Sequence, residues 1–172
     1  MCGIIGAISL SGAPLPALNR DAALQALYHR GPDESGEFVA RGIFMATRRL
    51  AIIDPAHGQQ PVQNETGRFH VAMNGELYDY DLRLAELQAA GHTFNSHCDT
   101  EVAVHLFEDR WAGALDAIDG QFGLAAYDLQ EHKLILARDR MGICPLFYAQ
   151  VGDVLLFASE AKALFATGMI VP

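Results

Sequence analysis

The chain has 172 residues, about one domain, and its 51% hydrophobic and 19% charged residues are enough to bury a core, which excludes an intrinsically disordered protein. It carries 12 lysines and arginines against 21 aspartates and glutamates, and this formal charge of −9 disfavours nucleic acid and anionic membranes as partners. The sequence has neither an apolar run of membrane-spanning length nor a signal-peptide pattern, so we expect a cytoplasmic protein.

The first predicted element is a buried strand at residues 4–8, where Ile4, Ile5 and Ile8 have small residues between them. An amphipathic helix is expected over residues 17–29, because its apolar residues recur at helical spacing, and Pro32 stops it. Several short strands are predicted to follow. They cover residues 37–40, 43–48, 50–53 and 69–73.

Two helices are predicted in the middle of the chain, over residues 80–90, where Gly91 stops the helix, and over residues 99–110. Two hairpins follow them. They pair residues 121–128 with 133–138 and residues 146–151 with 154–158. The second hairpin turns at Gly152-Asp153, which suits a type II′ turn. Because helices are separated from runs of strands, the chain is predicted to have an α+β fold with mostly antiparallel sheets.

The three cysteines, Cys2, Cys98 and Cys144, are widely spaced, which predicts free thiols rather than a disulfide framework or a zinc site. At the start of a buried strand, Cys2 is ordinarily a small buried hydrophobe. If Met1 is removed, however, Cys2 carries both a thiol and a free α-amino group, and that amine can act as the base for its own thiol. Cys2 is therefore also a candidate nucleophile for acyl transfer.

The dipeptide Asn74-Gly75 has two interpretations. After an apolar strand, Asn-Gly is a strong signal for a short hairpin turn. Alternatively, the Asn74 amide and the Gly75 backbone N–H are adjacent donors that can form an oxyanion hole, with glycine allowing close approach of the backbone.

Two charged residues are also ambiguous. Arg49 precedes the apolar residues 50–53 and lies either on a solvated edge or, turned inward, holds a carboxylate with its planar guanidinium. Asp99 either caps a helix or accepts an ammonium group. In the second interpretation, Arg49 and Asp99 bind the two charges of an α-amino acid while Cys2 attacks its side-chain carbonyl.

Several motifs together resemble the class II glutamine amidotransferase domain, and within it the glutaminase domain of glutamine-dependent asparagine synthetases. They are MCGIIG at residues 1–6, HRGPDESG at 29–36, RLAIID at 49–54, NGELY at 74–78 and DTE at 99–101, supported by ARDRMGI at 137–143 and ASEAKAL at 158–164. The resemblance covers essentially the whole chain, residues 1–172, as one glutaminase domain. It implies the four-layer αββα sandwich of N-terminal nucleophile hydrolases.

The resemblance also implies roles for individual residues. Cys2 attacks the glutamine carboxamide, forms a thioester and releases ammonia, while Asn74 and Gly75 form the oxyanion hole. Arg49 holds the α-carboxylate and Asp99 the α-ammonium group. Glu76 and the backbone of Leu50, Ile52 and Ile53 complete the glutamine pocket.

The remaining conspicuous residues are interpreted as structural. Arg30 and Asp33 are expected to hold a loop by hydrogen bonds. His97 and Cys98 offer too few ligands for a metal, so no metal site is predicted. Cys144, where family members often carry lysine, is expected to be a buried or inert thiol.

The expected partners are L-glutamine and a synthetase that receives ammonia. The sequence lacks a Ser-Gly-Gly-x-Asp-Ser pyrophosphate loop and a GxxxxGK[ST] motif, so ATP and magnesium are expected only in a synthetase subunit or domain outside this chain, in a homo- or hetero-oligomer. The alternative is a non-catalytic module that binds glutamine or docks on such a synthetase, which retention of Met1 would favour. A third hypothesis is a related amidase acting on another amide.

Overall fold

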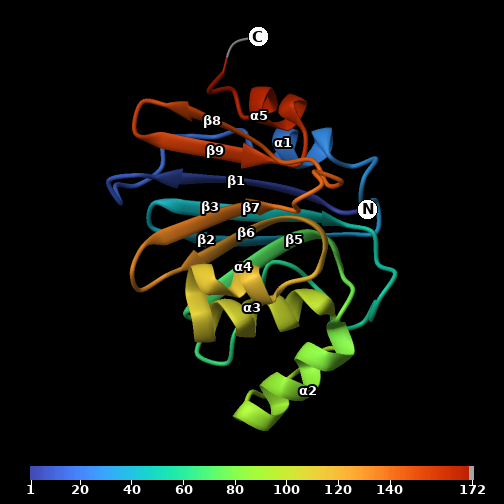
Figure 1. The fold of residues 1–172 in the computed structure, drawn as a ribbon. Coiled ribbons are helices and arrows are strands. Elements are labelled where there is room, and N and C mark those ends of the chain that lie inside the picture. The colour runs from blue at the N-terminus through green and yellow to red at the C-terminus, as the bar shows by residue number, and fades with distance from the viewer. Residues whose placement is uncertain (171–172) are drawn as a thin grey trace.

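The computed structural model describes residues 1–170, and its centre is formed by two antiparallel sheets. The first sheet has five strands in the order β2-β3-β1-β9-β8 (Figure 1). Its strands are β1, Gly3–Ser9; β2, Glu34–Ala40; β3, Ile43–Arg49; β8, Phe147–Val151; and β9, Val154–Ala158. The N-terminal strand is therefore the central strand of this sheet, paired with β3 and β9.

The second sheet has four strands in the order β4-β5-β6-β7. Its strands are β4, Val62–Gln63; β5, Phe69–Leu77; β6, Gly120–Asp128; and β7, Lys133–Arg138. The two sheets share an apolar layer in which Ile4 and Ile8 of β1 pack with Ala125 and Tyr127 of β6. Because side chains alternate along a strand, Ile5 and Ala7 of β1 point to the other face of the first sheet.

Helices cover the two outer faces, which gives four layers (Figure 1). Helices α1, Arg20–Ala26, and α5, Ala161–Ala166, pack on the first sheet. Helices α2, Tyr80–Ala90, α3, Asp99–Arg110, and α4, Ala114–Ala117, lie on the side of the second sheet, together with the 3₁₀ turn at Trp111–Gly113. The structure thus confirms the predicted α+β sandwich with antiparallel sheets.

The structure corrects three predictions. Residues 50–53 form a loop rather than a strand, because the Asp33 carboxylate accepts the Ala51 N–H at 2.9 Å and Arg49 binds the Ile53 carbonyl at 2.6 Å. The predicted helix over 17–29 is limited to α1, whose first turn is capped by Asn19. The predicted strand over 69–73 continues to Leu77 as β5.

That longer strand excludes the hairpin interpretation of Asn74-Gly75, since Asn74 pairs with Gly123 and Gly75 with Phe122 across β6. The helix-cap interpretation of Asp99 is also wrong, because Cys98 occupies the cap position and no side chain caps the helix. Strand β4 and helices α4 and α5 are too short to give a periodic signal in the sequence. Among residues 1–170, none of the helices combines the length and apolar character needed to cross a membrane.

Candidate active site

A cavity of about 250 Å³ lies where β1 begins, β3 and β5 end, and α3 begins. The structure brings all nine predicted site residues to its wall. They are Cys2, Arg49, Leu50, Ile52, Ile53, Asn74, Gly75, Glu76 and Asp99. Four more residues line it that were not assigned a role there from the sequence. They are Met1, Cys98, Gln121 and Cys144.

Cys2 is held by its backbone rather than by its thiol. Its carbonyl oxygen accepts a hydrogen bond from Arg30 Nε at 2.8 Å, and Arg30 Nη1 lies 2.9 Å from Glu160 Oε1. Partial burial opposes ionisation of Glu160, but hydrogen bonds from Arg30, Lys162 and His29 outweigh it and lower the Glu160 pKa to about 2. Arg30 was expected to hold a loop, whereas its hydrogen bonds go to Cys2 and Glu160, and the bond to Cys2 fixes the backbone of the candidate nucleophile.

The side chain of Asn74 is fully buried, and neither its amide nitrogen nor its amide oxygen has a hydrogen-bond partner among the described residues. An unpaired buried polar group costs about 1–3 kcal/mol, which a ligand can recover by bonding to it. Gly75 follows it where β5 and β6 approach closely, and a Cβ at this position would collide with the Gln121 carbonyl and the Phe122 backbone. Packing alone thus requires glycine here, next to a free amide that faces the cavity.

Arg49 reaches the cavity, but most of its donors are already in use. The residue is 4% exposed, with Nη1 bonded to Glu34 at 2.8 Å and Nη2 to the carbonyls of Ile53 at 2.6 Å and Asp54 at 2.9 Å. These bonds anchor the loop over residues 50–55 to the end of β3. A carboxylate that binds Arg49 must therefore use its remaining donor, Nε, or replace one of the loop carbonyls.

Two carboxylates meet on another wall. Burial raises the pKa of Asp99, and the nearby charge of Glu76 raises it further, although the Leu77 N–H donates to Asp99 Oδ2 at 3.1 Å and opposes the shift. A carboxylate with a raised pKa beside a second carboxylate attracts a cation as well as a proton. The arrangement suits an ammonium group.

The cavity contains all three thiols of the chain. Burial raises the pKa values of Cys98 and Cys144, and Asp139 adds to the shift of Cys144, so both remain protonated and weakly nucleophilic at neutral pH. Cys144 is 1% exposed, in agreement with a buried thiol. Gln121 was missed because its place opposite Glu76 depends on the register of β5 and β6, which the sequence does not specify.

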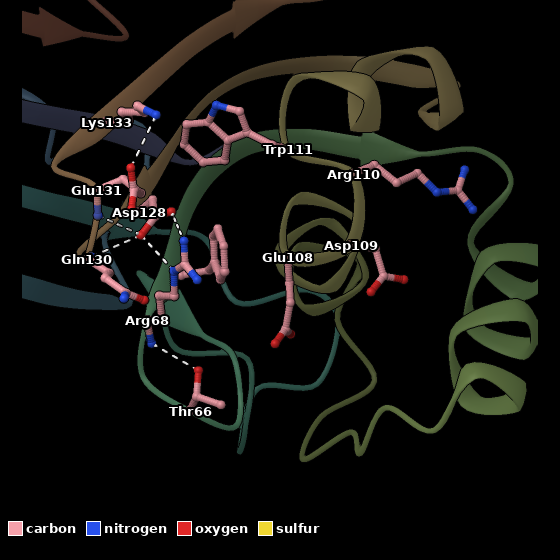
Figure 2. Close-up of a pocket in the computed structure, with 11 residues that line it drawn as sticks. Thr66, Arg68, Glu108, Asp109, Arg110, Trp111, Asp128, Gln130, Glu131 and Lys133 are labelled. Carbon is pink, nitrogen blue, oxygen red and sulfur yellow. Dashed lines mark hydrogen bonds and ion pairs between the residues drawn. The ribbon is translucent and has the colours of Figure 1, made fainter.

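A larger groove of about 760 Å³ lies elsewhere, between the turn before β5, the end of α3 and the β6–β7 hairpin (Figure 2). Its walls contain none of the predicted site residues. The charged side chains there largely neutralise each other: Arg68 Nη2 lies 2.6 Å from Asp128 Oδ2 and Lys133 Nζ 3.4 Å from Glu131 Oε2. Size alone therefore does not identify the reactive site.

Residues 1–171 match the family model described as a glutamine amidotransferase domain. The chain is 40% identical over 169 residues to asparagine synthetase [glutamine-hydrolyzing] 2 of Bacillus subtilis (strain 168), covering 96% of this chain and 22% of that protein. It is 38% identical over 166 residues to asparagine synthetase [glutamine-hydrolyzing] 2 of Oryza sativa subsp. japonica, covering 95% and 28%. It thus spans about a quarter of the length of these relatives.

Among solved structures, the glutamine phosphoribosylpyrophosphate amidotransferase from B. subtilis superposes with a TM-score of 0.78 at 21% identity, over 97% of this chain and 44% of that chain. At that identity the match shows a shared fold.

Proposed function

Because the chain belongs to the glutamine amidotransferase domain family, we propose that it hydrolyses L-glutamine to glutamate and ammonia and supplies the ammonia to a synthetase. The observation that carries this proposal is the composition of the 250 Å³ cavity. It combines a cysteine next to the chain start, a buried free amide, one guanidinium group and two carboxylates. Each group matches one part of the glutamine molecule.

The proposed reaction begins at Cys2. Once Met1 has been removed, the α-amino group takes the thiol proton and Cys2 Sγ attacks the carboxamide carbon. The carbonyl oxygen becomes an oxyanion, for which Asn74 Nδ2 and the Gly75 N–H are the proposed donors. The carbon–nitrogen bond then breaks, and the nitrogen leaves as ammonia with the proton held by the amine. Water adds to the thioester and releases glutamate, which restores the thiol.

Substrate recognition in this proposal depends on charge. Asp99 and Glu76 bind the α-ammonium group, and Arg49 binds the α-carboxylate by giving up a contact to the 50–55 loop or through Nε. The exposed side chains of Ile52 and Ile53 form the rim of the cavity, and the backbone from Leu50 onward completes it. An amide without both α-groups would leave these charges unpaired, so glutamine is favoured over simple amides.

The ammonia acceptor lies outside this chain in our proposal. The curated relatives are named as glutamine-hydrolysing asparagine synthetases and are several times longer. We therefore propose a synthetase domain or subunit that activates an acid with ATP and Mg²⁺, in the cytoplasm, and that receives the ammonia released at Cys2.

The proposal is tested by glutamate and ammonia release from glutamine, together with intact mass after treatment with 6-diazo-5-oxo-norleucine. The expected result is loss of Met1, a single adduct on Cys2, and no adduct or activity above background in Cys2→Ala. Cys144→Ala is the matched control, because it removes another thiol of the same cavity and should still give one adduct. Equal rates in the native protein and Cys2→Ala would contradict hydrolysis. Retained Met1, no adduct and measurable glutamine binding would instead support the non-catalytic module.

A further inference from the structure

Four side chains with metal-binding atoms meet beside the middle of α3, away from the cavity. Glu65 lies in the turn between β4 and β5, His92 lies two residues after the end of α2, and His105 and Glu108 are three residues apart on α3. One ligand atom from each lies within 4.8 Å of the others. They come from three separate segments, so no contiguous sequence motif predicts the cluster.

The distances between the imidazole nitrogens and the carboxylate oxygens are close to those between two ligands of one metal ion. His105 Nδ1 lies 3.4 Å from Glu65 Oε2 and 3.5 Å from Glu108 Oε2, while His92 Nδ1 lies 3.6 Å from Glu65 Oε1 and from Glu108 Oε2. Zinc binds histidine nitrogen and carboxylate oxygen at about 2.0–2.2 Å, so two ligands of a tetrahedral zinc are about 3.3–3.6 Å apart. The four histidine–glutamate distances agree with this spacing, and the other two pairs, His92 with His105 and Glu65 with Glu108, lie within the 4.8 Å limit of the group.

Several buried polar atoms of these four side chains lack a hydrogen-bond partner within residues 1–170. His105 is 1% exposed, and neither of its ring nitrogens has a hydrogen-bond partner among the described residues. Glu108 Oε2 is likewise buried and without a partner. Two carboxylates and two neutral imidazoles carry a charge of −2, which one divalent cation neutralises while it occupies the free lone pairs.

Neighbouring groups orient two of the ligands. His92 Nε2 lies 3.1 Å from Asp109 Oδ1, which leaves Nδ1 directed at the cluster, and such carboxylate–histidine pairs are typical of metal ligands. The Thr93 N–H donates to Glu65 Oε1 at 2.8 Å and fixes that carboxylate. Glu108 and Asp109 both project from α3 in Figure 2, where Glu108 also reaches the edge of the charged groove.

We propose that Glu65, His92, His105 and Glu108 bind one Zn²⁺ ion. Four protein ligands leave no open position for substrate, so the site is structural. Metal enters from solvent past the partly exposed carboxylates, whereas His105 forms the inner wall. The ion joins the β4–β5 turn and the connection between α2 and α3 to the body of α3, and that connection leads directly to Cys98 and Asp99 of the cavity.

The test is Zn²⁺ titration of chelator-treated protein by calorimetry, in a Cys2→Ala background so that the most exposed thiol does not compete for the ion. One Zn²⁺ per chain is expected, with a rise of several degrees in the unfolding midpoint. Co²⁺ in place of Zn²⁺ should give the strong visible absorption of a tetrahedral site.

The decisive variants replace the two partly exposed ligands His92 and Glu65, because replacing buried His105 can prevent folding. His92→Ala and Glu65→Gln should each weaken Zn²⁺ binding about 100-fold or more and abolish the thermal shift. His97→Ala is the matched control, since it removes an exposed histidine from the same connection and should bind Zn²⁺ normally. Binding that is equal in the unsubstituted cluster and His92→Ala, or no stoichiometric binding at all, overturns the proposal. Neither outcome depends on glutamine hydrolysis.

Discussion

The cavity at the start of α3 and the His–Glu cluster at its middle satisfy their polar groups in opposite ways. In the cavity the charged side chains are bonded to the chain itself, Arg49 to Glu34 and loop carbonyls and Asp99 to the Leu77 N–H, while the neutral amide of Asn74 is left free. In the cluster the carboxylates and imidazoles face one another at distances too long for good hydrogen bonds. The cavity is therefore organised before its ligand arrives, whereas the cluster needs a positive charge to be complete.

The largest effect that separates the two regions is expected at Asn74. Asn74→Ala removes the proposed oxyanion donor and should lower kcat for glutamine about 10²–10³-fold with little change in KM. Zn²⁺ binding should be unchanged, because the cluster shares no residue with the cavity. The measurement is steady-state glutamate release, with exposed Asn95→Ala as the control. A kcat within threefold of the native value would show that Asn74 is not an oxyanion donor.

A smaller effect on catalysis is expected at Asp99, combined with a gain in stability. Asp99→Asn removes a proposed partner of the α-ammonium group and should raise KM for glutamine about tenfold or more. Because burial raises the Asp99 pKa in the folded protein, its charged form costs stability above that pKa, and the variant should be more stable than the native protein at pH 7.

That gain in stability should shrink as the pH falls and vanish below the unfolded pKa of about 3.8, where Asp99 is neutral in both states. Urea unfolding at a series of pH values measures it. Asp81→Asn in the first turn of α2 controls for simple loss of negative charge. If Asp99→Asn instead lowers the free energy of unfolding at pH 7, the Asp99 carboxylate stabilises the fold and is not kept at a cost in stability for a ligand.

The smallest effect is expected at Glu160, which supports Cys2 through Arg30. Its pKa is lowered from 4.5 to about 2 in the folded protein, so its contribution is present above pH 4.5 and is lost as the pH falls through 2. Glu160→Gln should reduce the free energy of unfolding by about 1 kcal/mol at neutral pH, because solvent screens a partly exposed pair. Chemical unfolding at pH 7 and in acid tests this, with Glu131→Gln of the exposed Lys133 pair as the control. If both variants lose the same free energy of unfolding, the contact between Glu160 and Arg30 contributes no more stability than an exposed ion pair.

The sequence predicts the cavity better than it predicts some of the elements that build it. Cys2, Asn74-Gly75 and Asp99 are found because each lies in a short contiguous motif. The strand predicted at 50–53 is wrong because Ile52 is 74% exposed, the Ala51 N–H donates to Asp33 and the Ile53 carbonyl accepts from Arg49, so neither group is left for a neighbouring strand. Local pattern does not reveal which polar side chain will satisfy a loop.

The His–Glu cluster illustrates the limit of contiguous motifs. His105 and Glu108 are three residues apart, but Glu65 and His92 join them only when the β4–β5 turn and the end of α2 pack against α3. The register of β5 and β6, which brings Gln121 opposite Glu76, is likewise a product of sheet packing. Residues of this kind become visible only in three dimensions.

The central position of β1 has a consequence for dynamics. The first residues of a protein are usually its loosest, and their amide hydrogens exchange with solvent within seconds. Here the strand from Gly3 is fully buried and bonded on both edges, so its amides should exchange only when the whole domain unfolds. Cys2 is thus tethered, one residue away, to what should be among the slowest-exchanging segments of the molecule, and local fraying cannot carry its thiol out of the cavity.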